Sequence, residues 1–149
     1  MLLKDMYTPD VVCCLPGTHV MAAAALMRQR HVGDLVVIDN LEDTRVPLGV
    51  VTDRDLVVEV MAKGLDPAKV TVGSLLNKPV VIAEESEDTS RVIERMRLHG
   101  IRRVPVVDQR GAVVGIVTLN DLLNVVVGEA HALLETTVRG QRQEQHSRR

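Results

Sequence analysis

GVVTDRDL, at residues 49–56, is nearly repeated as GIVTLNDL at residues 115–122, an offset of 66 (115 − 49). Upstream, LVVID at 35–39 corresponds to VPVVD at 104–108, an offset of 69 (104 − 35). The first copy therefore holds three extra residues (69 − 66), which fall in the loop NLEDTRVP at 40–47. Insertions of this kind belong to surface hairpins. The pattern indicates a duplicated domain of about 60 residues.

Each copy predicts the element order β-α-β-β-α. In the second copy, TSRVIERMRLHG (89–100) has helical apolar spacing and a terminal Gly, and two β-branched runs then flank the turn QRG at 109–111. Short strands are expected before each helix, at VVCCL (11–15) and PVVIA (79–83). Since one such unit cannot cover its own sheet, we expect an α/β (α+β) fold in which two repeats pack with pseudo-twofold symmetry.

The expected domain boundaries follow the repeats, with one repeat at residues 1–66 and the second at 67–137. Residues 138–149 are expected to form a disordered basic tail, because RGQRQEQHSRR (139–149) has four arginines, one glutamate and no apolar side chain.

Composition excludes several classes of function. The net charge is −2 over 149 residues, and Tyr7 is the only aromatic residue, so neither charge nor base stacking favours nucleic acid as a partner. No apolar run approaches the ~20 residues of a membrane span, and the N-terminus lacks a signal-peptide core, so a cytoplasmic location is expected. The adjacent Cys13 and Cys14 and the spacing of the histidines fit no metal site, and none is expected.

The repeated phrase T-x-x-D fits two interpretations. Thr52 with Asp55, and Thr118 with Asp121, have the spacing of a helix capping box, which needs no ligand. Alternatively, each helix begins directly after a strand, where free N–H groups and the positive helix dipole suit phosphate, and the Asp suits ribose hydroxyls. The two roles are compatible in one residue pair.

The tandem pattern resembles a CBS domain pair, or Bateman module. The resemblance rests on VGDLVVID…PLGVVTDRDLV and IRRVPVVDQRGAVVGIVTLNDLL, covers roughly residues 1–137, and is closest to small stand-alone bacterial CBS-pair proteins. It implies clefts between the repeats that bind adenosine-containing ligands: AMP, ADP or ATP, with S-adenosylmethionine or NAD as further candidates, and no required cofactor. It also implies a homodimer.

The resemblance assigns residues to two clefts, in which the Thr and Asp contact phosphate or ribose and the apolar residues line the adenine. The first cleft would hold Val11, Val12, Val32, Thr52, Asp55, Arg102 and Arg103. The second cleft would hold Asn77, Val80, Val81, Ile101, Thr118 and Asp121. Asn77 stands where the family often has Thr or Ser, and its counterpart in the first repeat is Tyr7 or Thr8, depending on a one-residue choice of register.

The repeats disagree just before their second strands, where Gly33 and Asp34 correspond to Arg102 and Arg103. The resemblance implies that this segment reaches across the pseudo-twofold axis, which sends the arginines to the first cleft and Asp34 to the second. Arginine holds phosphate oxygens and aspartate repels them. Alternatively, both arginines are solvated surface charge.

The sequence leaves three classes of function to compare. The first is a regulatory adenine-nucleotide sensor acting on a protein partner that the sequence does not identify. The second is a ligand-independent scaffold for dimerisation and protein interaction, and the third, an enzyme, is disfavoured because no nucleophile–base pair, HExxH or phosphate-binding loop is present. A dimer contact is expected on surplus apolar faces, with Val57, Val125 and Val127 as candidates.

Overall fold

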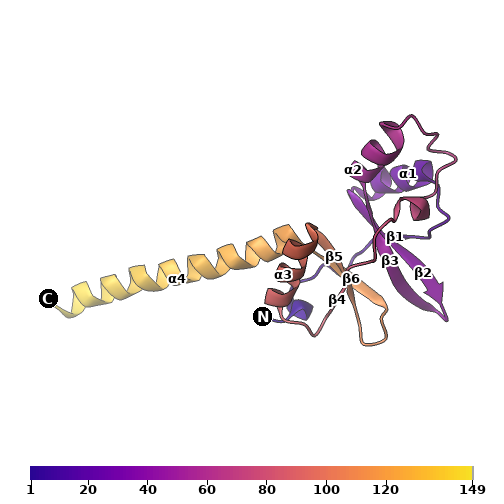
Figure 1. The fold of residues 1–149 in the computed structure, drawn as a ribbon. Helices are drawn as coiled ribbons and strands as arrows, with labels where there is room; N and C mark the ends of the chain where they lie inside the picture. The colour runs from indigo at the N-terminus through magenta and orange to yellow at the C-terminus, as the bar shows by residue number, and fades with distance from the viewer. Residues whose placement is uncertain (149) are drawn as a thin grey trace.

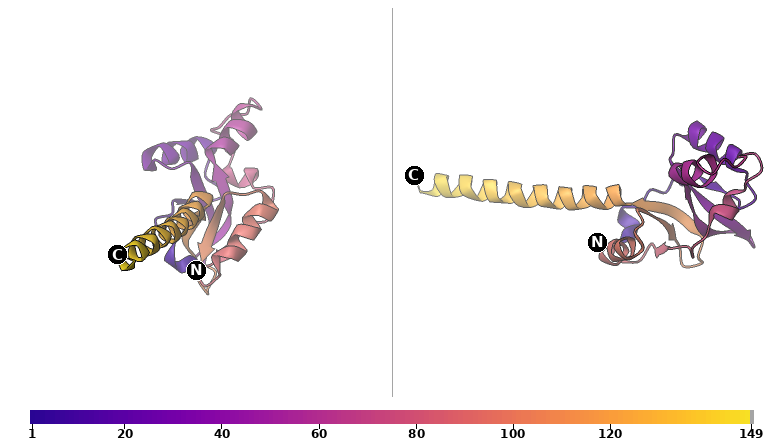
Figure 2. Two further views of the ribbon diagram at one scale, coloured as in Figure 1. Left: turned by 90° about the vertical axis from the view of Figure 1, so that its left-hand side faces the viewer. Right: turned by 45° about the horizontal axis from the view of Figure 1, so that its top comes forward.

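The computed structural model describes residues 1–148 as two similar lobes and one long helix that extends away from them (Figures 1 and 2). The elements of the first repeat are β1 (Cys13–Cys14), α1 (Val20–Arg30), β2 (Asp34–Leu41), β3 (Thr44–Thr52), α2 (Asp53–Asp55) and η2 (Leu56–Met61). Those of the second repeat are β4 (Ala83–Glu84), α3 (Thr89–His99), β5 (Arg103–Val107), β6 (Val113–Thr118) and α4 (Leu119–Ser147). Two short 3-10 helices, η1 (Leu3–Asp5) and η3 (Val72–Leu75), precede the repeats.

The expected β-α-β-β-α order is confirmed in both repeats. Each forms a three-stranded sheet, β1-β2-β3 or β4-β5-β6, in which the hairpin is antiparallel and the first strand pairs parallel to it. The first strands are shorter than predicted, because only Cys13–Cys14 and Ala83–Glu84 come into register with the hairpins. The helix after β3 is also irregular, since it turns into a π-helix at η2.

The two sheets pack against each other through branched aliphatic side chains. Val36 and Ile38 of β2 meet Val113 and Ile116 of β6 in a buried cluster, which Val11, Cys13 and Val50 extend. Each sheet is covered on its other face by its own helices and core. The sheets are thus buried on both faces, which explains the nearly unbroken apolar runs of β2 and β5.

The short segment that precedes each repeat packs into the hydrophobic core of the other repeat. Leu3 of η1 is fully buried in the core of the second repeat, and Val72 of η3 is fully buried in the core of the first. Backbone hydrogen bonds fix both segments, including Leu3 N to Glu87 O (2.9 Å) and Val72 N to Thr18 O (2.8 Å). A division into contiguous repeats at 66/67 therefore describes the duplication but not the packing.

This exchange explains the glycine that opens each copy of the repeated phrase. A Cβ on Gly49 would lie 2.8 Å from Leu76 Cδ2, and a Cβ on Gly115 would lie 2.2 Å from Tyr7 Cδ2 and 2.5 Å from the Thr8 carbonyl oxygen. The segment leading into one repeat lies directly over the last strand of the other, and only glycine leaves room for it.

The expectation of a disordered tail is not met, because α4 continues unbroken to Ser147. Residues 139–147 are rich in Gln and Arg, which have good helix propensity, and they extend a helix already nucleated at Leu119. Along residues 1–148, no helix is long and apolar enough to cross a membrane.

Leu3→Ala is expected to destabilise the protein by about 2–5 kcal/mol, because it leaves a cavity in the core of the second repeat, although Leu3 is only the third residue of the chain. Leu2→Ala is the matched control, since Leu2 is 38% exposed. Urea denaturation of both variants measures the difference. Equal, small losses would mean that η1 is not part of the second core in solution.

Candidate functional site

Both T-x-x-D motifs form complete capping boxes where a strand ends and a helix begins. In the first, Thr52 N donates to Asp55 Oδ2 (2.9 Å) and Asp55 N donates to Thr52 Oγ1 (3.2 Å). In the second, Thr118 N donates to Asp121 Oδ2 (2.8 Å) and Asp121 N donates to Thr118 Oγ1 (3.2 Å). The capping interpretation is therefore confirmed at both positions.

The capping boxes leave part of each carboxylate available. Among residues 1–148 the Oδ1 atoms of Asp55 and Asp121 accept no hydrogen bond, and all four capping residues are partly exposed. Each carboxylate could accept hydrogen bonds from a ribose while its Oδ2 maintains the cap. Capping and ligand contact are geometrically compatible here.

In the first repeat, the backbone N–H groups at the helix start, which were expected to be free, are mostly hydrogen-bonded within the protein. Asp53 N donates to Gly33 O (2.9 Å) and Arg54 N donates to Asp53 Oδ1 (2.8 Å), so the first turn is internally satisfied. In the second repeat, Leu119 N donates to Arg102 O (2.8 Å), and Asn120 N has no partner within residues 1–148. At the first helix start, therefore, side chains are the main donors available to an anion.

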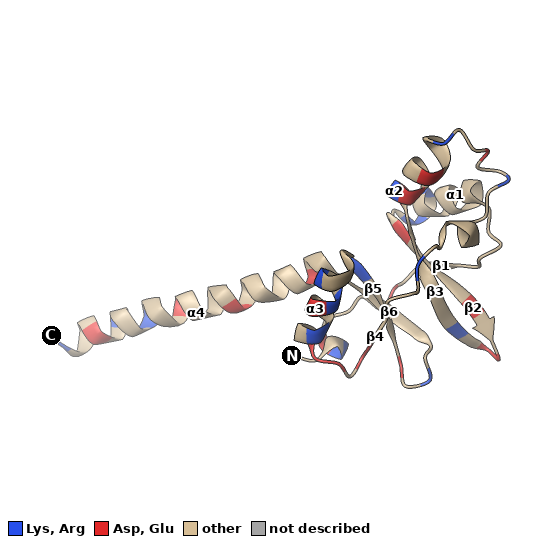
Figure 3. Cartoon of the chain, in the orientation of Figure 1, with Lys and Arg blue, Asp and Glu red and all other residues tan. Residues whose placement is uncertain are grey.

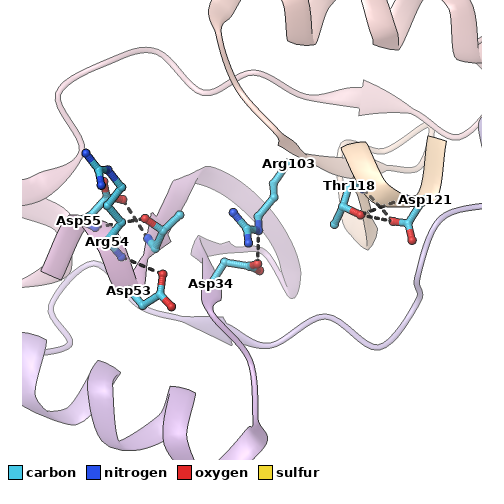
Figure 4. Close-up of polar contacts among 8 residues, drawn as sticks. Asp34, Asp53, Arg54, Asp55, Arg103, Thr118 and Asp121 are labelled. Atoms are coloured by element: carbon cyan, nitrogen blue, oxygen red, sulfur yellow. Dashed lines mark hydrogen bonds and ion pairs between the residues drawn. The ribbon is translucent and has the colours of Figure 1, made fainter. Parts of the chain in front are cut away.

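Asp34 and Arg103 form an ion pair between the two capping boxes (Figure 4). In the sheet registers Asp34 lies opposite Thr52, and Arg103 lies opposite Thr118. Each is the first residue of its hairpin, and Arg103 Nε approaches Asp34 Oδ2 to 2.5 Å. The contact joins equivalent positions of the two repeats, so it lies on their pseudo-twofold axis.

The Asp34 carboxylate is in an unfavourable electrostatic environment. Its side chain is 19% exposed. Burial raises the pKa of Asp34 above its ordinary value; Arg103 opposes this shift, and the nearby Asp53 carboxylate adds to it. Asp53 was not among the predicted site residues, although a Cβ on Gly33 would lie only 3.1 Å from its Oδ2.

The assignment of Arg103 and Asp34 to separate clefts does not anticipate this contact, in which the two side chains reach toward each other. The sequence could not reveal this, since charges 69 residues apart give no sign that they meet. Arg102 is exposed, and only its carbonyl takes part in the junction, as the acceptor for Leu119 N.

The predicted apolar lining residues are partly buried, and most of them pack against the hydrophobic cores. Val32 and Ile101 follow residues in the left-handed conformation, His31 and Gly100, at the ends of α1 and α3. The remaining four, also partly buried, lie before β1 or β4: Val11, Val12, Val80 and Val81.

Asn77 is exposed and lines a different hollow. This hollow, of 480 Å³, lies between η2 and η3, with Glu59, Lys63 and Lys69 among its lining residues. Asn77 makes no hydrogen bond to Thr118 or Asp121. A second hollow of 250 Å³ is lined by residues that include Met6, Ile93 and Val125. Neither hollow includes a capping-box residue.

Comparison with known proteins identifies the repeats. The model of the CBS domain matches residues 3–62 and 72–128. An uncharacterized protein of Methanopyrus kandleri is 34% identical over 116 residues, which cover 78% of this chain and 58% of that protein. Hypoxic response protein 1 of Mycobacterium tuberculosis is 33% identical over 119 residues, which cover 80% of each chain.

Solved structures agree with these matches. The crystal structure of Hypoxic Response Protein I with two coordinated zinc ions has a TM-score of 0.71 at 31% identity, covering 83% of this chain and 98% of that one. A CBS domain pair in complex with 5′-methylthioadenosine and S-adenosyl-L-methionine has a TM-score of 0.73 at 27% identity, covering 87% and 98%. Within residues 1–148, no group of three or more His, Cys, Asp or Glu side chains could hold a metal ion.

Arg103→Gln should destabilise the protein by about 1–3 kcal/mol at pH 7, because it leaves the half-buried Asp34 carboxylate without its cation. Asp34→Asn should cost little or be neutral, because it removes the group whose ionised form burial disfavours. Urea denaturation at pH 7 measures both variants.

The loss in Arg103→Gln should also shrink as the pH falls. With the pKa of Asp34 raised, the folded state binds a proton more readily than the unfolded chain, so stability recovers as the pH falls through the raised pKa. A larger loss for Asp34→Asn than for Arg103→Gln would contradict this account of the pair.

Proposed function

The chain belongs to the CBS domain family. We propose that it is a non-catalytic regulatory module that binds an adenosine-containing ligand between its two repeats. AMP, ADP and ATP are the first candidates, with S-adenosylmethionine or NAD as further ones. The module would act in the cytoplasm, where ligand binding would change its contact with a regulated protein.

The observation that carries the proposal is the pair of capping boxes flanking the Asp34–Arg103 contact (Figure 4). At each box the end of a strand supplies a hydroxyl and the first turn of the following helix supplies a carboxylate with a free oxygen. Partly buried aliphatic residues such as Val32 and Ile101 lie at the entry to each hairpin. Apolar lining with a few fixed polar groups is typical of small-molecule sites.

The ligands of a related structure support an adenosyl compound. The CBS domain pair with 27% identity was solved with 5′-methylthioadenosine and S-adenosyl-L-methionine, which share adenine and ribose but carry no phosphate. The shared adenosine part is therefore the feature we expect this chain to recognise. Whether a phosphate is also recognised depends on the charged residues between the boxes.

A thermal-shift series with AMP, ADP, ATP, S-adenosylmethionine, NAD and GTP tests the proposal. A ligand that binds only the folded state stabilises it by about 2.7 kcal/mol at a hundredfold excess over Kd. We expect at least one adenosyl compound to raise the melting temperature while GTP does not. No shift with any adenosyl compound would favour a ligand-independent scaffold, and progressive loss of ATP would indicate an enzyme.

Asp55→Ala and Asp121→Ala should weaken binding of whichever ligand stabilises the wild type, while the protein stays folded. Loss of a capping partner costs about 1 kcal/mol, well below the stability of a typical domain. Ser90→Ala is a matched control, because it removes a hydroxyl that bonds Asp88 at the start of α3, away from both boxes. Calorimetry on each variant decides, and unchanged affinity in both Asp variants would leave these residues as caps alone.

We also propose that the chain forms a homodimer through α4. Large apolar side chains recur along this helix at spacings of three, four and seven residues and are about half or more exposed: Leu123, Val126, Val127, Leu133, Leu134 and Val138. A helix extending alone into water is marginally stable, so this face requires a partner. Of the earlier candidates, Val57 and Val127 are exposed, whereas Val125 is only partly so.

The charges of α4 favour a second copy as that partner. Asp121 and Glu129 lie in the first half of α4 and Glu135 just past its middle, whereas Arg139, Arg142 and Arg148 lie in or just beyond its last part, together with the single acid Glu144. Figure 3 shows these acidic and basic residues along the helix. An antiparallel pair of these helices would bring acidic residues opposite basic ones. Such an arrangement has the two-fold symmetry common to homodimers.

Leu134→Glu should convert the dimer to monomer, because it places a carboxylate in the apolar contact. Ala132→Glu is the control, since residues two apart on a helix point in nearly opposite directions and Ala132 lies off the apolar face. Both side chains are exposed in the single chain, so neither change should unfold it. Sedimentation velocity distinguishes the variants, and a Leu134→Glu protein that remains dimeric would locate the interface elsewhere.

A further inference from the structure

Arg103 lies between the two capping boxes, where it faces Asp34 (Figure 4). The capping boxes, the strand-to-helix junctions and the entry residues Val32 and Ile101 are equivalent in the two repeats. The two repeats differ in charge at two places: Asp34 faces its counterpart Arg103 before the hairpins, and the first capping box contains Asp53 and Arg54 where the second has Leu119 and Asn120. Of these differences, the Asp34–Arg103 pair is the one that joins the two repeats.

The pair leaves Arg103 able to bind an anion. Arg103 approaches Asp34 through Nε, and within residues 1–148 its Nη nitrogens donate no hydrogen bond. The side chain is 37% exposed, so these donors can be reached from solvent. A phosphate in the first cleft could be bound by the Nη groups, either beside Asp34 or in place of it.

The pair also leaves Asp34 as an obstacle to anions. Its carboxylate is the more buried of the two groups and lies near the Asp53 carboxylate. An anion approaching Arg103 must either displace Asp34 from the guanidinium or lie close to two carboxylates. Both routes reduce the affinity for phosphate, whereas an uncharged adenosine would be little affected.

We propose that Asp34 and Arg103 form a charge selector that admits one phosphate per chain and weakens its binding through competition by Asp34. This inference rests on the proposed adenosyl-ligand function and specifies its ligand class: one monophosphate-sized anion at Arg103, with an uncharged or cationic adenosyl ligand as the only occupant suited to the other cleft.

Isothermal titration calorimetry of the full chain with AMP and with adenosine tests the selector. In wild type we expect at most one AMP per chain. Asp34→Asn should tighten AMP by about tenfold, a factor that corresponds to about 1.4 kcal/mol, because Arg103 loses its competitor. Arg103→Gln should weaken AMP by about tenfold or more. Adenosine affinity should change by less than about threefold in both variants.

Two variants control for the change in net charge. Asp39→Asn removes a carboxylate from the far end of β2, and Arg97→Gln removes an exposed arginine from α3. Neither should alter the ratio of AMP to adenosine affinity. The selector is overturned if Asp34→Asn matches Asp39→Asn in AMP affinity, if AMP and adenosine change equally, or if wild type binds two equivalent AMP molecules.

The failure of the selector can be told apart from failure of the proposed function. If wild type binds no adenosyl compound and Asp34→Asn gains no AMP binding, the function and the selector both fail. If wild type binds adenosine or AMP and Asp34→Asn leaves AMP affinity unchanged, only the selector fails.

Discussion

The contact between the two sheets determines where every other part of the site lies. Val36 and Ile38 of one hairpin and Val113 and Ile116 of the other exclude water between the repeats. Because β2 and β6 are held face to face, the two hairpin entries meet, and Asp34 and Arg103 come within ion-pair distance. The Asp34–Arg103 ion pair thus depends on the packing of the aliphatic cluster between the two sheets.

The exchange of η1 and η3 makes the two repeats interdependent. Leu3 completes the second core and Val72 the first, and Tyr7 and Leu76 cover Gly115 and Gly49. Neither repeat can bury its core with its own contiguous residues alone. A ligand that altered the distance between the repeats would therefore act on both cores, which is a property suited to a regulatory module.

The strand-to-helix junctions were largely predictable, because the interactions are local. A capping box requires only Thr and Asp three residues apart at a helix start, and both boxes formed as the spacing indicated. The availability of N–H groups was not predictable. It depended on the carbonyl groups of Gly33 and Arg102, which arrive from another strand. The position of Asn77 was not predictable either, because it depends on the path of the linker after η3, which no local sequence pattern encodes.

Residue order alone encodes the duplication, the order β-α-β-β-α, the hairpins and the caps, because each follows from hydrophobic periodicity or from contacts within a few residues. Only the folded chain reveals the segment exchange and the pairing of Asp34 with Arg103. These features depend on groups that are distant in sequence. The free energy of such contacts arises only once the two sheets have come together, so no short stretch of residues could reveal it.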